Sequence, residues 1–219
     1  MPKTPGAAQR LPVGAGTMDG MRQTTPAGNG ETTSGPSLVT FGHGTADAGT
    51  MTRLLHGAGI RRLVDVRTAP GSRRNPDASR AAMTDWLSRA GVDYRWDRRL
   101  GGWRKASPAS PDVALRNESF RGYAEHMRTA EFHAAVEELR ADVEADPTAV
   151  LCAESVWWRC HRKLIADFLV LVHGIAVHHL MHDGSLRPHS PSPAARLIPD
   201  ERVLIYDEDG SSRGSGHSG

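Results

Sequence analysis

The sequence predicts an α/β fold: a single domain of three layers, with a mostly parallel sheet and helices on both faces. Two observations carry this prediction. Short apolar segments alternate along the chain with longer segments in which apolar residues recur at helical spacing. Breakers rich in glycine or proline separate the two kinds of segment. Alternating strands and helices are typical of parallel sheets, because a crossover helix returns the chain to the starting edge of the sheet.

The elements follow from these patterns in chain order. The apolar run 38–41 predicts a first strand, and a helix over 48–58 follows it and ends before Gly59. The same logic gives the remaining elements: strands at 63–67, 92–96, 149–152 and 175–180, and helices at 79–90, 123–145 and 162–173. The strand at 175–180 is expected to close the series. The polar stretch 97–118 predicts a long loop, which in a compact domain is usually functional or partly disordered.

The two ends of the chain differ in composition from this domain. Residues 1–36 hold seven Gly and five Pro with almost no large aliphatic residues, and residues 208–219 are similarly rich in glycine and serine. Such segments cannot offset the entropy lost on ordering. We therefore expect a disordered N-terminal tail over 1–36, a domain over 37–207 and a disordered C-terminal tail over 208–219.

Charge and hydropathy exclude several classes of protein. The 219 residues carry 27 Lys and Arg against 25 Asp and Glu, a net charge of +2, which is too small for a bulk polyanion binder. No apolar run is long enough to span a membrane, and residues 1–11 lack a secretory signal pattern. We expect a soluble cytoplasmic protein with no membrane partner, whose two cysteines are thiols.

Polar side chains gather at the predicted carboxyl ends of the strands, where ligands bind in open α/β sheets. They follow the first, second and fourth strands and precede the last helix: His43, Asp65, Arg67, Cys152, Glu154, Cys160, His161 and Arg162. We expect these side chains to converge on one rim of the sheet.

Several of these residues belong to motifs that resemble those of a known family. The motifs, in chain order, are Gly42-His43-Gly44-Thr45, Val64-Asp65-Val66-Arg67 followed by Pro70 to Pro76, Leu100-Gly101-Gly102, Phe120-Arg121-Gly122-Tyr123-Ala124, and Cys152-Ala153-Glu154 through Cys160-His161-Arg162. Together they are similar to the DUF488 family, a domain family of unknown function, over about residues 38–206. The resemblance implies a small α/β domain and brings no established reaction.

The cysteines are the most distinctive feature. Cys160 is expected at a helix N-terminus and is flanked by Arg159, His161 and Arg162. The helix dipole and the neighbouring positive charges both lower the pKa of a thiol. We therefore expect Cys160 to be a thiolate nucleophile or redox thiol and Cys152 its partner. Buried cysteines that serve only packing are the alternative.

Metal binding is a second interpretation of the same residues. Cys152, Cys160 and His161, with His43 as a fourth ligand, would suit zinc or iron. Adjacent residues at a helix start are expected to point in different directions, which disfavours joint ligation by Cys160 and His161. We therefore assign no metal and no cofactor from the sequence.

His43 and two carboxylates complete the predicted catalytic set. His43 lies between two glycines, which we expect to hold it exposed at the rim as a general acid or base. Asp65 and Glu154 are expected to orient catalytic groups. The alternatives are a solvated histidine, an Asp65 paired with Arg67 or His43, and a Glu154 that caps a helix.

A third set of residues predicts binding of an anion, because guanidinium groups recognise phosphates and carboxylates and aromatic rings stack on bases. The predicted substrate-binding residues are Arg67, Arg73, Arg74, Arg121, Tyr123, His161 and Arg162. We therefore expect a thiol-dependent enzyme that acts on an anionic small molecule, a nucleotide or a nucleic acid. The alternative is a non-catalytic nucleic-acid-binding module with structural or metal-bound cysteines. The sequence assigns no oligomeric state.

Overall fold

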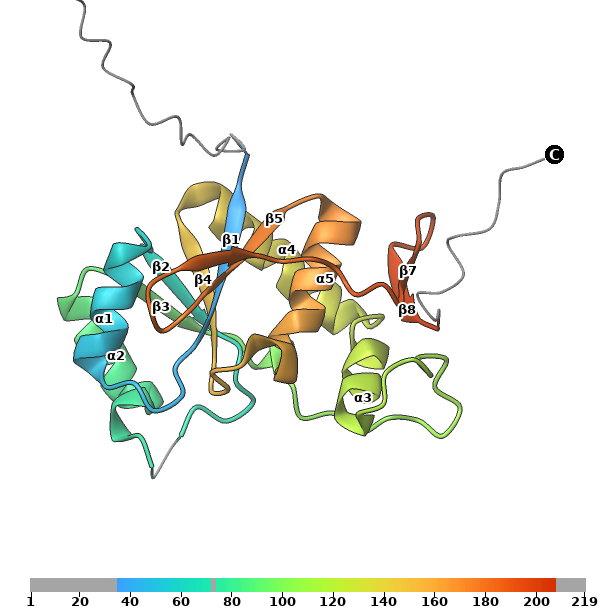
Figure 1. Cartoon of the computed structure of the whole chain (residues 1–219), viewed down its shortest axis with the longest axis horizontal. Helices are drawn as coiled ribbons and strands as arrows, with labels where there is room; N and C mark the ends of the chain where they lie inside the picture. Colours follow the sequence, from blue (N-terminus) through green and yellow to red (C-terminus); the bar gives the residue numbers. More distant parts are fainter. Residues whose placement is uncertain (1–34, 72–73, 208–219) are drawn as a thin grey trace, which may run out of the picture. The chain divides into compact units, whose positions relative to one another are not determined.

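A computed structural model describes residues 35–71 and 74–207. Its main sheet has six strands in the order β3-β2-β4-β1-β5-β6, and all neighbours pair in parallel except β5 and β6. Figure 1 shows β1 between β4 and β5 near the middle of this sheet. The strands are β1 (Ser37–Gly42), β2 (Arg62–Asp65), β3 (Asp93–Trp96), β4 (Thr148–Cys152), β5 (Ala176–Leu180) and β6 (Leu186–Pro188).

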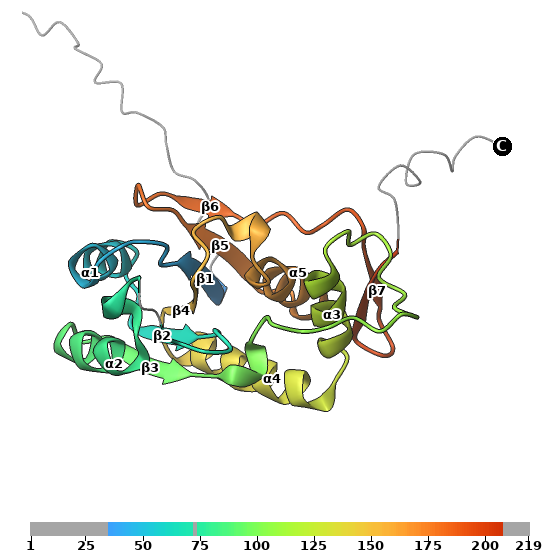
Figure 2. The same ribbon diagram turned by 90° about the horizontal axis from the view of Figure 1, so that it is seen from below.

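Helices cover both faces of this sheet, as Figure 2 shows: α1 and α2 lie on one side and α4 and α5 on the other. The helices are α1 (Ala48–Gly57), α2 (Arg80–Arg89), α3 (Glu118–His126), α4 (Ala130–Ala145) and α5 (Arg162–His173). The described residues also form three 3-10 turns, each between a strand and the helix that follows it: η1 (Pro76–Ala78), η2 (Arg98–Leu100) and η3 (Trp157–Arg159). The three-layer α/β fold with a mostly parallel sheet is confirmed.

Alternation along the strands divides the core into two clusters, because successive side chains of a strand point to opposite faces. Val39 and Phe41 of β1 pack with the apolar residues of α1 and α2. Leu38 of β1 and Val150 of β4 pack with those of α3, α4 and α5. Cys152 belongs to this second cluster, so its side chain lies on the α5 side of the sheet.

One predicted helix is two helices in the structure. The pattern over 123–145 predicted a continuous helix, but α3 ends at His126 and α4 begins at Ala130. Thr129 causes the break, because its hydroxyl accepts a hydrogen bond from the Phe132 amide and caps α4. The segment 97–117 is irregular apart from η2, and its side chains Leu100 and Leu115 are buried in the core.

The expectation that 175–180 is the last strand is wrong. β6 pairs antiparallel with β5, and a separate two-stranded sheet follows, formed by β7 (Ala195–Ile198) and β8 (Val203–Tyr206). Buried polar contacts fix this segment, since Asp167 of α5 accepts hydrogen bonds from His189 Nε2 (2.9 Å), the Ser192 amide (2.8 Å) and the Tyr206 hydroxyl (3.1 Å). These strands are short, and tertiary contacts rather than a local pattern define them.

Several predictions about the ends of the chain lie outside the described residues. The predicted tails fall there, apart from residues 35 and 36, and so does Arg73. The disorder of both tails and the boundaries 37 and 207 therefore stay predictions. None of the helices in the described part of the chain is long and apolar enough to cross a membrane. The cytoplasmic location stays a prediction.

Candidate functional site

A pocket of about 390 Å³ opens at the carboxyl ends of β1, β2 and β4. Strand ends at this edge supply one wall, and the loops after β2 and β3 supply the opposite wall. Six of the predicted site residues line it: His43, Arg67, Cys152, Glu154, Cys160 and His161. The sheet therefore brings these residues together, as its topology predicts.

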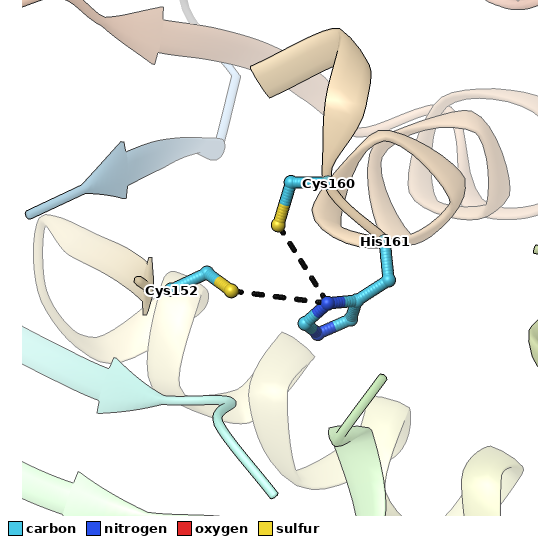
Figure 3. A group of neighbouring side chains, drawn as sticks. All are labelled: Cys152, Cys160 and His161. Atoms are coloured by element: carbon cyan, nitrogen blue, oxygen red, sulfur yellow. Dashed lines mark hydrogen bonds between the residues drawn. The ribbon is translucent and has the colours of Figure 1, made fainter. Parts of the chain in front are cut away.

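Two sulfur atoms and one imidazole meet at the pocket (Figure 3). The Sγ atoms of Cys152 and Cys160 lie 3.8 and 3.6 Å from Nδ1 of His161. All three atoms lie within 4.8 Å of one another, and all three residues are buried. Both cysteines are free thiols.

The expectation that Cys160 and His161 point apart is wrong. Cys160 has an extended backbone (φ −120°, ψ 147°), whereas His161 already has helical dihedrals (φ −58°, ψ −22°) as the N-cap of α5. This change of conformation between neighbours turns both side chains toward Cys152, as Figure 3 shows. The two sulfurs and the nitrogen are ligand types that zinc accepts, with a fourth position toward the pocket.

One observation at this cluster argues against a resident metal. A histidine that ligates a metal through one ring nitrogen almost always donates its other N–H to an acceptor. Nε2 of His161 is buried and has no hydrogen-bond partner among the described residues. The backbone of Gly102 covers the same ring so closely that a Cβ there would lie 2.4 Å from Nδ1.

The two sulfurs shift each other's pKa in opposite directions. Hydrogen bonding with the Cys160 thiol, the His161 imidazole and the positive charge of Arg162 hold the pKa of Cys152 well below its usual range despite burial. Hydrogen bonding with Cys152 and burial raise the pKa of Cys160 well above its usual range. These directions make Cys152 the more acidic thiol of the coupled pair, whereas the sequence predicts Cys160 as the nucleophile, and the identity of the reactive thiol stays a prediction.

Arg162 is a buried counter-charge and is not placed to bind a substrate. Its guanidinium is 2% exposed, does not line the pocket, and donates to the carbonyls of Glu154 and Ser155. No carboxylate of the described residues forms an ion pair with it, and its Nε has no partner there. A buried cation needs a compensating negative charge. Its positive charge is one of the causes that lower the pKa of Cys152.

Close packing explains the glycines around His43. A Cβ on Gly42 would lie 1.9 Å from the Glu154 carbonyl oxygen and 2.6 Å from the Arg162 guanidinium. Gly44 has a φ of +53°, and a Cβ there would lie 2.0 Å from the Ser155 hydroxyl. Because positions 42 and 44 carry no side chain, the loop after β4 can pack directly against them. His43 between them is only 3% exposed. The expectation of an exposed histidine at the rim is wrong.

His43 belongs to a hydrogen-bonded network on the α2 side of the sheet. Its Nδ1 donates to the Gly44 carbonyl (2.9 Å), and its Nε2 accepts from Nη1 of Arg67 (3.2 Å). Burial and the Arg67 charge lower the pKa of His43, so the ring is neutral. Asp65 is fully buried and accepts from Arg67 Nε (2.8 Å) and from the Tyr94 hydroxyl (2.7 Å).

Arg67 has no donor left for a substrate. Its Nη1 also donates to the Ala78 carbonyl (2.8 Å), and its Nη2 donates to Asp65 (2.5 Å) and to the Met83 sulfur (3.2 Å). With Nε and the bond to His43, all five N–H groups are used. The alternative that Asp65 is paired with Arg67 is the one the structure shows, and Arg67 is a positioning residue.

Three other predicted residues, Tyr123, Arg121 and Arg74, lie outside the pocket, whereas Glu154 lies at it. Tyr123 is fully buried and donates to the Leu100 carbonyl (2.9 Å), so it presents no ring face to a ligand and its assignment to substrate binding is wrong. Arg121 donates to the Leu115 carbonyl (3.0 Å) and lies outside the pocket. Arg74 is exposed and does not line the pocket either. Glu154 is exposed at the pocket, where its carboxylate accepts from the Val156 amide (3.1 Å).

The pocket also contains residues that the prediction of the site did not include. They include Arg159 of η3, Trp103, which is 79% exposed, Asn117 at the N-cap of α3, and Ser119 and Phe120 of α3. The segment 97–118 supplies Trp103 and Asn117, and its length and its aromatic residues were the sequence signals for this part of the site.

The comparisons with known proteins give one result. The model of the family described as "Domain of unknown function DUF488" matches residues 48–169, more than half of the chain. An α/β domain with a cysteine-histidine cluster at the sheet edge is the class that fold and site define. The chain belongs to the DUF488 family. No match was found among curated proteins or among solved structures.

Proposed function

We propose that the protein is an enzyme that uses the Cys152 thiolate as a nucleophile on a small anionic substrate bound in the pocket. One observation carries the proposal: the Cys152 sulfur lies beside the Cys160 sulfur and the His161 imidazole in the lining of the pocket, and the buried charge of Arg162 lowers its pKa. A thiolate, rather than a thiol, is the reactive form of cysteine.

The other residues of the cluster have distinct parts in this proposal. Cys160 donates its S–H to the thiolate, and Nδ1 of His161 lies within reach of both sulfurs, where it can pass a proton to a leaving group. Arg162 stabilises the charge. The Asp65–Arg67–His43 network forms one wall, and its imidazole can act as a base only after its bond from Arg67 breaks.

Size and charge favour a small anion over a polymer. A volume of about 390 Å³ lies in the range of small-molecule sites. Arg159 is the one arginine that both lines the pocket and is exposed, among the described residues. The N-terminus of α5, whose first residue is Arg162, adds the positive end of a helix dipole. Trp103 and Phe120 offer ring faces to a planar group, which suits a nucleotide.

The first experiment is alkylation of the full-length protein followed by mass spectrometry of each cysteine across pH. We expect Cys152 to react with an apparent pKa far below the ordinary value of about 8.5, and Cys160 to react slowly. Charge preference is tested with iodoacetate and iodoacetamide, which are of similar size but differ in charge. Relative to free cysteine, Cys152 should favour iodoacetate.

Matched arginine variants sharpen this test. Arg159→Ala should lower the iodoacetate preference several-fold, whereas Arg89→Ala should not, because Arg89 is exposed on α2 and pairs only with Asp85 among the described residues. Slow alkylation of both cysteines would refute the thiolate. Slow alkylation that a chelator accelerates would replace it with a metal site at the same three atoms.

A further inference from the structure

We propose that Cys152 is oxidised by small hydroperoxides and that Cys160 then closes a reversible Cys152–Cys160 disulfide. The proposal rests on the thiolate of the proposed function and adds a second reaction of the same site. In it, Cys160 is the resolving thiol and the disulfide switches the nucleophile off.

The position of the two sulfurs carries the proposal. They lie no more than 4.8 Å apart, and each contacts the same nitrogen of His161. A disulfide has an S–S distance of about 2.05 Å, so each sulfur must move by roughly 1.4 Å or less. Cys160 precedes α5 in an extended conformation, so this movement does not require the helix to unwind.

The surroundings select a small oxidant. Cys152 and Cys160 are 8% and 4% exposed, and the pocket is their route to solvent. A protein disulfide is too large to reach sulfurs buried to this extent, whereas hydrogen peroxide and short alkyl hydroperoxides fit a pocket of about 390 Å³. The thiolate that we propose for Cys152 is the form of cysteine that peroxides oxidise.

The chemistry balances in two steps. First, the Cys152 thiolate attacks the terminal oxygen of the hydroperoxide. The O–O bond breaks, an S–O bond forms, and the departing alkoxide takes a proton and leaves as an alcohol, or as water from hydrogen peroxide. Cys152 becomes a sulfenic acid by a two-electron oxidation.

In the second step the Cys160 sulfur attacks the Cys152 sulfur. An S–S bond forms, the S–O bond breaks, and the hydroxide leaves as water with the proton of Cys160. Nδ1 of His161 touches both sulfurs and can relay this proton. A dithiol reductant returns the two electrons by thiol–disulfide exchange.

The test uses the reduced full-length protein and a small excess of hydrogen peroxide, followed by a quench with N-ethylmaleimide in denaturant, which labels every remaining thiol, before intact-mass measurement. We expect both cysteines to lose labelling together, with a product lighter by two hydrogens that dithiothreitol restores. Cys160→Ser should instead stop at a sulfenic acid on Cys152, which dimedone traps. Cys152→Ser should leave Cys160 fully labelled.

Three outcomes would overturn the proposal: retained labelling of both cysteines, a disulfide only between two chains, or equal oxidation of Cys160 in Cys152→Ser. The alkylation experiment separates this failure from that of the proposed function. Fast, low-pKa alkylation of Cys152 without disulfide formation would refute the disulfide alone. Slow alkylation of Cys152 would refute the thiolate on which both proposals rest.

Discussion

Two groups of polar residues meet at the pocket and differ in how completely their hydrogen bonds are satisfied. On the α2 side, Arg67 uses all five donors and His43 uses both ring nitrogens. On the α5 side, Nε2 of His161 and Nε of Arg162 have no partner among the described residues. A saturated network holds a structure in place, whereas unsatisfied buried groups are costly unless they serve a function. We therefore propose that the first group supports the fold and that the second group carries the chemistry.

The largest expected effect is on stability, in the saturated network. Asp65→Ala leaves the Arg67 charge buried without its partner and removes the acceptor of the Tyr94 hydroxyl. We expect the free energy of unfolding, measured by urea denaturation, to fall by about 3 to 5 kcal/mol. Arg89→Ala, which breaks an exposed pair, is the control and should cost less than about 0.5 kcal/mol. A similarly small loss of stability in Asp65→Ala and Arg89→Ala would contradict a supporting role for the network of Asp65, Arg67 and His43.

A second saturated network predicts sensitivity to acid. His179 is buried, contacts Thr40 (2.6 Å) and His189 (3.0 Å), and has its pKa lowered to about 3, mainly by burial and also by the neighbouring His189 and Arg162. Because the folded-state pKa is depressed, this contribution to stability is complete above the unfolded pKa of 6.5 and is lost as pH falls toward 3.

Stability should therefore decline by about 1.4 kcal/mol per pH unit below pH 6.5 through this residue alone. The measurement is the free energy of unfolding at several values between pH 7 and pH 5. His179→Gln should flatten the slope by that amount, while His56→Gln, at an exposed position of α1 that is not among the groups that lower the pKa of His179, should leave it unchanged. Equal slopes in all three proteins would rule out His179 as the titrating group.

Substitutions in the cluster of Cys152, Cys160 and His161 should change the reactivity of Cys152 more than they change the stability of the protein. Cys160→Ala removes the thiol that donates to Cys152, and a hydrogen bond to a charged group contributes about 1.5 to 3 kcal/mol. The apparent pKa of Cys152 should rise by about one to two units, since one unit corresponds to about 1.4 kcal/mol. Alkylation rates across pH measure it. An unchanged profile would show that Arg162 and His161 hold the thiolate without Cys160.

The smallest stability effect is expected at the pocket mouth. Trp103 is 79% exposed, so Trp103→Ala should change the free energy of unfolding by less than about 0.5 kcal/mol. Its ring should instead matter for binding of planar anions, which fluorescence titration with nucleoside monophosphates measures. Trp158→Ala, another exposed tryptophan outside the pocket lining, is the control. A drop in stability at Trp103 would mean that its ring packs on the fold.

The fold was largely predictable because its strands are apolar and its helices are periodic. The strands at 149–152 and 175–180 differ from the observed ones by a single residue at one end. The strands β6, β7 and β8 were missed because each has only three or four residues and depends on distant contacts such as that of Tyr206 with Asp167. Local patterns do not encode such contacts.

The membership of the site was more predictable than the roles within it. The carboxyl-edge rule brought His43, Cys152 and His161 together. Whether Arg67 is free for a ligand depends on Asp65, two residues away, and on three partners in three other segments, whose distances from Arg67 cannot be inferred from the local sequence. The opposite pKa shifts of Cys152 and Cys160 have the same origin, because they depend on how the two thiols, His161 and Arg162 are arranged in space.

The central position of β1 has a consequence for how the chain folds as it is synthesised. Leu38 of β1 pairs with Thr148 and Val177, residues that are made 110 and 139 positions later. Until β4 and β5 leave the ribosome, β1 has no strand on either side. Such non-local pairing is slow and leaves edges open to wrong partners. Of the strands in the described residues, the first to be made is therefore among the last to gain its neighbours, and chains stalled before residue 152 should depend most on chaperones.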